Sequence, residues 1–443
     1  MVKVNKTASL ILATVLVFCA SAGCTAGGGG SKDNGNEKPI DRQEPVTLTF
    51  YSMPAFKLDQ IQTHIIEPVR KKFPHITIEV VDNTSGKKID EVVNQFVTAN
   101  AIPDFMLTNY STVRTLKSLG IAFDLSSLIK GNKVDVAKFM PRAIEYLKLY
   151  SEQNELYSLP FFINVNTMSY NKDIFDKFGV AYPRDGMTWE EISDLAKNLT
   201  RSVDGVDYLG VNPNRPYVIA PQLSLDVIDP KTGKAAVNND GWKRVFQLFQ
   251  NIYSIPGNVP KNQNDFWGAK NSFYRNQNLA MNLLWWDQTV GGLQELQNGN
   301  KEFKWDLITV PIFAEKPKMG QWLDQFDMTI SSQSKHKEVA FQVIDYLTSA
   351  EYQMELSKNG YISSLNYPAI KEQLGANLPF LKGKNVQALF KMDYSKPLSR
   401  LNFDVNELMN PFYVGMVYNN KDVNTTLREL EEKLNQAIQE SGR

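Results

Sequence analysis

Hydrophobic and polar positions form two kinds of pattern along most of the chain, short apolar runs and helical spacing. Short runs rich in β-branched and aromatic residues occur at 46–51, 76–81 and 105–108. Between these runs, apolar residues recur every three or four positions over 58–72 and 89–101, a spacing typical of amphipathic helices. The order strand, helix, strand, helix, strand predicts an α/β fold built on a parallel, doubly wound sheet.

The later part of the chain repeats these patterns. Thr188 and Glu191 stand three residues apart before an apolar run, which is the signature of a capping box and predicts a helix from there to about residue 199. Further strands are predicted at 305–310 and 327–330, and further helices at 338–348 and 425–440. Residues 226–234 (DVIDPKTGK) lack the spacing of a calcium loop and predict a β-turn hairpin.

The N-terminus has the pattern of a targeting segment. Lys3 and Lys6 precede an apolar stretch at 8–20, which is too short to span about 30 Å of hydrocarbon but typical of a secretory signal peptide. The small residues 21–23 precede Cys24, an arrangement that resembles the bacterial lipobox, although Ser21 stands where Leu is usual. We therefore predict that residues 1–23 are removed and that Cys24 carries fatty acyl chains such as palmitate. The alternative is an ordinary signal peptide cut nearby, with Cys24 a spare thiol.

Residues 24–45 are rich in Gly, Asn and charge and have no apolar period. Such a segment behaves as a flexible tether, and a coil of this length reaches about 25 Å. The predicted protein is thus anchored by lipid to the extracellular face of the bacterial cytoplasmic membrane and does not span it.

Composition excludes several function classes. The chain of 443 residues has 48 Lys+Arg and 48 Asp+Glu, so it has no basic field for nucleic acid. Three His and two Cys argue against a disulfide scaffold or a zinc module, and we expect no cofactor and no metal. No HExxH or GxSxG motif occurs, and we predict that the protein is not an enzyme. A glycoside hydrolase using Asp287 with Asp324 or Asp327 is the weaker alternative, because acids are common enough to pair by chance.

Four segments in order resemble the family of bacterial extracellular solute-binding proteins that serve carbohydrate ABC importers, the maltose-binding-like family 1. The first is VTLTFYSMPAF with IIEPVRKKFPHITIEVV, and the second is residues 156–200, with YNKD and TWEE. The third is NQNLAMNLLWWDQTVGGL at 276–293, and the fourth is residues 327–365, from DMTISS to NGYISSL. Each motif is weak alone, but the ordered set covers nearly the whole predicted mature chain.

The resemblance implies a two-lobed periplasmic-binding-protein-like (type II) fold, with a hinge of crossover segments and a ligand cleft between the lobes. It places the crossings near 163–168, after 310 and near 359–363. Lobe 1 would comprise 46–163 plus 311–360, and lobe 2 would comprise 166–308 plus 362–443. The implied role is capture of a sugar or oligosaccharide by a monomer and delivery to an ABC permease, with reporting to a membrane sensor as the alternative.

Sugar binding needs aromatic faces for C–H groups and planar polar side chains for hydroxyls. Because ligands of open α/β sheets bind beyond the carboxyl ends of strands, we select residues at predicted strand ends and crossings. These candidates are Tyr51, Met53, Asn109, Tyr110, Asn164, Trp285, Trp286, Asp287, Trp322, Asp324 and Tyr361. Alternation along a strand predicts that only one of Trp285 and Trp286 stacks on the ligand. Simpler roles remain open: core packing for Tyr51 and Trp322, surface or capping roles for both acids, and turn capping for the asparagines.

Overall fold

The computed structural model describes residues 44–52, 56–81, 89–149, 151–261, 263–266, 268–396 and 405–441. The elements described all belong to one compact unit, residues 45–443. The predicted signal peptide, Cys24 and most of the predicted tether lie outside the described residues. Among the helices described, none combines the length and the apolar character needed to cross a bilayer.

A six-stranded sheet forms the first half of the fold, with strand order β12-β4-β11-β3-β1-β2. Its strands are β1 (Val46–Ser52), β2 (Ile76–Val80), β3 (Phe105–Asn109), β4 (Leu159–Asn164), β11 (Asp324–Ile330) and β12 (Ile362–Ser363). β1 pairs in parallel with β2 and β3, as the sequence predicts. However, β11 runs antiparallel to both β3 and β4. The expectation of a wholly parallel sheet is therefore wrong, because a strand from far along the chain inserts between β3 and β4.

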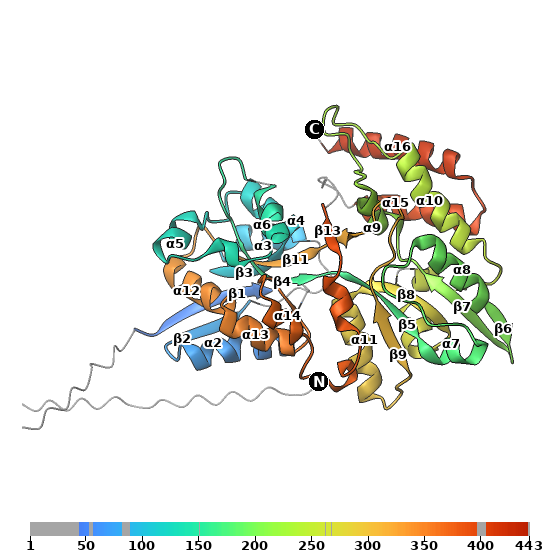
Figure 1. Ribbon diagram of the computed structural model, residues 1–443. Coiled ribbons are helices and arrows are strands. Elements are labelled where there is room, and N and C mark those ends of the chain that lie inside the picture. The colour runs from blue at the N-terminus through green and yellow to red at the C-terminus, as the bar shows by residue number, and fades with distance from the viewer. Residues whose placement is uncertain are drawn as a thin grey trace, which may run out of the picture. The chain divides into compact units, whose positions relative to one another are not determined.

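Helices accompany this sheet (Figure 1). They are α1 (Leu58–Ile61), the π-helical turn η1 (Gln62–Ile66), α2 (Glu67–Lys72), α3 (Ile89–Ala99), α4 (Tyr110–Ser118), α5 (Ser126–Gly131), the 3₁₀ turn η2 (Val136–Lys138), α6 (Pro141–Lys148), α12 (Lys337–Leu347), α13 (Ala350–Lys358) and α14 (Pro368–Glu372). The apolar positions at 61, 65 and 69 are all buried. They pack in one core with Phe50 and Phe105, which explains the helical spacing found in the sequence.

A five-stranded sheet, order β6-β7-β8-β5-β9, forms the second half. Its strands are β6 (Arg201–Val203), β7 (Val206–Asn212), β8 (Leu279–Trp285), β5 (Asn166–Asn171) and β9 (Trp305–Ile308). The elements near it in Figure 1 are α7 (Lys172–Phe178), α8 (Trp189–Leu199), α9 (Pro216–Ile219), α10 (Asp240–Tyr253), α11 (Trp286–Asn298), α15 (Val405–Tyr418) and α16 (Val423–Glu440). Short turns complete it: η3 (Ala220–Leu223), η4 (Gln263–Phe266) and η5 (Asn271–Arg275).

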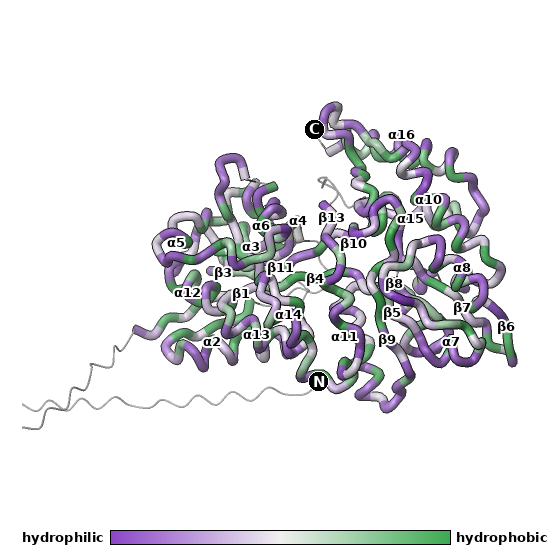
Figure 2. Tube along the Cα trace, in the orientation of Figure 1, coloured by the Kyte–Doolittle hydropathy of each residue, from purple (hydrophilic) through white to green (hydrophobic). Residues whose placement is uncertain are grey.

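The core of the second half uses the tryptophans that the sequence assigns to packing. Trp189 and Trp242 are fully enclosed, and Trp305 is nearly so; Trp267 lies outside the described residues. Figure 2 shows hydrophobic residues along the strands and polar residues on many helix turns. At 226–234, Ile228 and Ala235 form an isolated antiparallel bridge around a turn in which Gly233 has φ +67°, so the predicted hairpin turn is present.

The chain passes from the first sheet to the second at Val165, because β4 ends at Asn164 and β5 begins at Asn166. A two-stranded sheet of β10 (Met319–Trp322) and β13 (Asp393–Ser395) joins segments far apart in sequence. Two 3₁₀ turns, η6 (Pro379–Leu381) and η7 (Val386–Phe390), precede β13 along the chain. The sequence predicts that lobe 2 resumes at residue 362. In the structure, however, residues 362 and 363 form β12, which pairs with β4 in the first sheet. Ile312 likewise bonds to Trp189 of the second half, although 311–360 is predicted to lie in lobe 1.

Candidate functional site

The crossing at Val165 brings strand ends of the two large sheets together, because β4 and β5 are interior strands of those sheets. Asn164 lies opposite Asp324 in the first sheet, and Asn166 lies opposite Trp285 in the second. Because only Val165 separates the two asparagines, Asp324 and Trp285 belong to neighbouring strand ends. The carboxyl ends of β3, β4 and β8 thus meet the starts of β5 and β11, which is where open α/β sheets bind ligands.

Helix α11 begins at this crossing, and two hydrogen bonds join its first turn to residues of the crossing. The Trp286 N–H donates to the carbonyl of Val165 at 2.8 Å. The Asp287 N–H donates to Oδ1 of Asn164 at 3.2 Å. These bonds satisfy two backbone donors that the first turn of a helix leaves unpaired. The negative charge of Asp287 in this turn also complements the positive end of the helix dipole.

Asp287 is exposed to solvent, but neighbouring protein groups still affect the pKa of its carboxyl group. Desolvation by neighbouring protein raises the pKa of this carboxyl group above the usual value, opposed by a hydrogen bond from Asn164. A carboxylate in that position can accept hydrogen bonds from the hydroxyls of a ligand.

Two tryptophan rings meet where α11 begins, since Trp285 is the N-cap residue of that helix. Trp285 is half-buried, and its ring lies edge-to-face against Trp322, with centroids 5.5 Å apart and planes at 88°. Trp322 is only 8% exposed, so it mainly supports Trp285. Such edge-to-face pairs fix ring orientation. Of the two rings, Trp285 therefore offers the surface on which a ligand can pack.

An aromatic cluster surrounds Tyr361 on the side of the first sheet. Its ring lies 4.9 Å from His64 and 5.4 Å from both Phe56 and Phe162, all edge-on. Gln60 Nε2 donates to the Tyr361 hydroxyl at 3.1 Å. Burial raises the pKa of Tyr361 to about 12, and the nearby charge of Asp287 adds to the shift. Tyr361 is thus a neutral hydroxyl close to Asp287.

Comparison with known protein families identifies the chain. The family model of bacterial extracellular solute-binding proteins matches residues 59–354. The chain belongs to this family. Since the match covers well over half of the sequence, the resemblance found in the four motif segments is confirmed.

Solved structures agree with the fold of this solute-binding protein. An ABC substrate-binding protein from Listeria monocytogenes in complex with cycloalternan matches with a TM-score of 0.71 at 19% identity, covering 89% of this chain and 100% of that one. A sugar transporter protein from Rhizobium etli in an open conformation gives 0.72 at 20% identity, over 88% and 99%. A Mycobacterium tuberculosis protein in complex with glycerophosphocholine gives 0.69 at 15% identity, over 90% and 99%. The two-lobed α/β fold predicted from the sequence is confirmed.

Two predicted ligand residues of the solute-binding protein are enclosed in the core. Trp286 is 1% exposed and its indole N–H donates to the carbonyl of Gly360 at 2.7 Å, so it cannot offer a face to ligand. Tyr51 is 2% exposed and packs edge-on against Phe96 at 5.1 Å. Both assignments are corrected: each ring stabilises the fold where its strand ends.

The asparagines have backbone roles. Asn109 Oδ1 accepts from the Thr112 N–H at 3.0 Å and caps α4. Asn164 is buried and, as described above, positions Asp287. Met53 lies outside the described residues, as does the side chain of Tyr110. Asp324 is partly exposed beside the crossing, and its Oδ1 accepts from the Gln325 N–H at 3.1 Å.

The sequence reasoning missed the residues that surround Tyr361. Gln60 and His64 lie one turn apart in a segment that the sequence predicts as a helix from its apolar positions alone. Phe162 lies in the crossing strand, in PFFIN, where two adjacent aromatics must point to opposite sides. That alternation was the one available signal that a ring from β4 faces this cluster.

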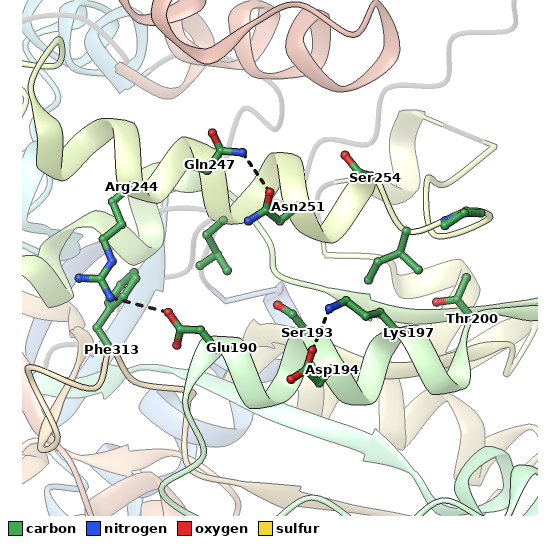
Figure 3. A pocket seen from close by; sticks show the side chains of 13 residues that line it. Glu190, Ser193, Asp194, Lys197, Thr200, Arg244, Gln247, Asn251, Ser254 and Phe313 are labelled. Atoms are coloured by element: carbon green, nitrogen blue, oxygen red, sulfur yellow. Dashed lines mark hydrogen bonds and ion pairs between the residues drawn. The ribbon is translucent and has the colours of Figure 1, made fainter.

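A separate pocket of the described structure lies away from the crossing. It has a volume of about 870 Å³ and lies between α8 and α10 (Figure 3). None of the predicted site residues lines it. Its charged groups satisfy one another, since Arg244 pairs with Glu190 and Lys197 with Asp194. We therefore place the candidate site at the crossing and not in this groove.

The structure excludes the pair Asp287 and Asp327 as the two catalytic carboxylates of a glycoside hydrolase. Asp327 is completely buried and its Oδ1 accepts from Gln325 Nε2 at 3.0 Å, so it cannot reach a substrate. In the part of the chain that the structure describes, no group of three or more His, Cys, Asp or Glu could hold a metal ion.

Proposed function

We propose that this solute-binding protein captures a sugar or short oligosaccharide at the crossing between its two large sheets. One observation carries the proposal: the half-buried ring of Trp285 packs edge-on against Trp322 at the start of α11, and the first turn of that helix carries an exposed acidic residue, Asp287. Pyranose rings present C–H faces that pack on aromatic rings, while their hydroxyls need planar polar partners. The site combines both kinds of group within neighbouring strand ends.

The energy needed is modest. Micromolar binding corresponds to about −8 kcal/mol, which one stacked ring and several hydrogen bonds can supply. Buried polar groups that are left unpaired by a wrong ligand then provide selectivity. We expect Asp287 and Tyr361 to supply the polar contacts to the ligand, with Asn164 holding Asp287 in place.

Related structures support a carbohydrate without deciding it. The Listeria monocytogenes protein is in complex with cycloalternan, whereas the Mycobacterium tuberculosis protein, of the same fold, is in complex with glycerophosphocholine. The fold therefore admits more than one ligand class. For this chain the tryptophan pair and the acidic residue at the start of α11 favour a neutral polyhydroxylated ligand.

We further propose how the protein acts in the cell. Residues 1–23 direct secretion, Cys24 receives the lipid anchor, and residues 24–45 tether a monomeric binding domain outside the membrane. Ligand contacts to both lobes favour a closed arrangement, which docks on an ABC permease. The chain itself catalyses no reaction.

A thermal-shift screen tests the ligand class. Neutral mono- and oligosaccharides are compared with amino acids, peptides, polyamines and glycerophosphodiesters, each in large excess over protein. A ligand at 100 times its dissociation constant adds about 2.7 kcal/mol to stability, which raises the melting temperature measurably. We expect stabilisation by sugars alone. Stabilisation by a non-sugar alone would refute the substrate class while leaving the family membership untouched.

A further inference from the structure

A small, partly open cavity lies at the start of β5, and Val165 of the crossing is among the residues that line it. It has room of about 20 Å³ for the centre of a water molecule. Asn166 of β5 and Gln321 of β10 line it, together with Ile308, Ala388, Leu389 and Tyr394. The cavity therefore lies where the second sheet, the β10–β13 pair and the segment around η7 come together.

Both amides at this cavity lack protein partners. Asn166 and Gln321 are each 4% exposed. Neither the nitrogen nor the oxygen of either side chain makes a hydrogen bond within the described structure. Buried amides are almost always hydrogen-bonded, because leaving water without a substitute partner is costly. Four unsatisfied amide atoms, all in residues that line one small space, therefore indicate an occupant.

The chemistry of the cavity defines that occupant. Each amide offers donor hydrogens and an acceptor oxygen, and no charged side chain lines the space. A metal ion would need an acceptor set and an anion a donor set, so the balanced set fits a neutral molecule that both donates and accepts. The space is far too small for a sugar but large enough for water, which needs about 10–15 Å³ and two to four polar partners.

We propose that this cavity is a hydration site, in which an internal water bridges the side chains of Asn166 and Gln321. The water ties the first residue of β5 to β10. Asn166 lies opposite Trp285 in the sheet, and Gln321 precedes Trp322. The bridge thus helps to hold the two strands that carry the tryptophan pair. It is a permanent part of the protein and does not depend on which ligand the protein captures.

A crystal structure of the ligand-free protein tests the site directly. At a resolution better than about 2 Å, we expect one ordered water within about 2.7–3.2 Å of an amide atom of both Asn166 and Gln321. An empty cavity would overturn the proposal, and so would amides that bond to each other or to other protein groups.

A substitution at Ala388, which lines the cavity, provides a test in solution. The two extra methyl groups of Ala388→Val would fill a dry cavity and leave the melting temperature unchanged or higher. If the cavity holds water, the valine displaces it and we expect a fall of about 2–4 °C. In the matched background Asn166→Leu/Gln321→Met, which has no amide to satisfy, the same valine should cause no fall. An equal fall in both backgrounds would attribute the effect to overpacking and contradict the proposal.

Discussion

Trp285 and Trp286 are neighbours in sequence with opposite roles. Trp285 is half-buried against Trp322, whereas Trp286 is enclosed and donates to Gly360. We expect Trp285→Ala to weaken sugar binding at least about tenfold, with a change in melting temperature of only a few degrees. Trp286→Ala should instead destabilise the protein by about 3–5 kcal/mol, because it leaves a large cavity.

Calorimetric titration and thermal melting distinguish these roles. Tyr367→Ala, which removes a partly exposed ring outside the candidate site, serves as the matched control and should change neither quantity greatly. Unchanged affinity in Trp285→Ala would show that ligand binds elsewhere. The sequence identified this pair as important, but only the register of β8 with β5 decides which ring faces outward.

Asp327 makes folding stability depend on pH. Burial raises the pKa of its carboxyl group to about 8, Asp324 adds to the shift, and a hydrogen bond from Gln325 opposes it. Below the unfolded pKa of about 4, both states hold the proton. Between about pH 4 and pH 8, only the folded state holds it, so this group's contribution to stability falls as pH rises and levels off above pH 8.

Asp327→Asn keeps a neutral side chain at every pH. The melting temperature of this variant minus that of the unaltered protein should therefore rise from pH 4 to pH 8 and then remain constant. Melting curves measured across this range check the expectation. A difference that does not vary with pH would mean that Asp327 titrates normally in the folded protein.

At the scale of elements, capping determines where α8 begins. Thr188 Oγ1 accepts from the Glu191 N–H at 3.1 Å, and the Thr188 N–H donates to the Glu191 carboxylate at 2.8 Å. We expect Thr188→Ala to lower the free energy of unfolding by about 1 kcal/mol, as measured by denaturant titration. Thr188→Ser retains the hydroxyl and should lose much less. Equal losses would assign the effect to the methyl group and not to the cap.

Element positions could be predicted well where local pattern decides them. The capping box predicted the start of α8, and short runs rich in β-branched and aromatic residues predicted β1, β2 and β3 within two residues at each end. The place of β11 in the first sheet could not be predicted, because pairing with β3 and β4 depends on contacts more than 150 residues apart. The cluster around Tyr361 could not be predicted for the same reason, because its members come from three segments that are far apart in sequence.

For the whole molecule, the family resemblance predicts movement. If ligand contacts both lobes, binding shifts the population toward a closed arrangement. Small-angle X-ray scattering should then show a smaller radius of gyration at saturating ligand than without it, and Trp285→Ala should need more ligand to reach the same value. An unchanged radius at saturation would contradict hinge closure in this protein.

The site's location is the central claim of this account, and a crystal structure with the most stabilising sugar tests it most directly. We expect one sugar ring packed on the face of Trp285, with hydroxyls within hydrogen-bonding distance of Asp287. Trp286 should remain buried and bonded to Gly360. A sugar bound in the groove between α8 and α10, or anywhere that leaves Trp285 without contact, would contradict the account.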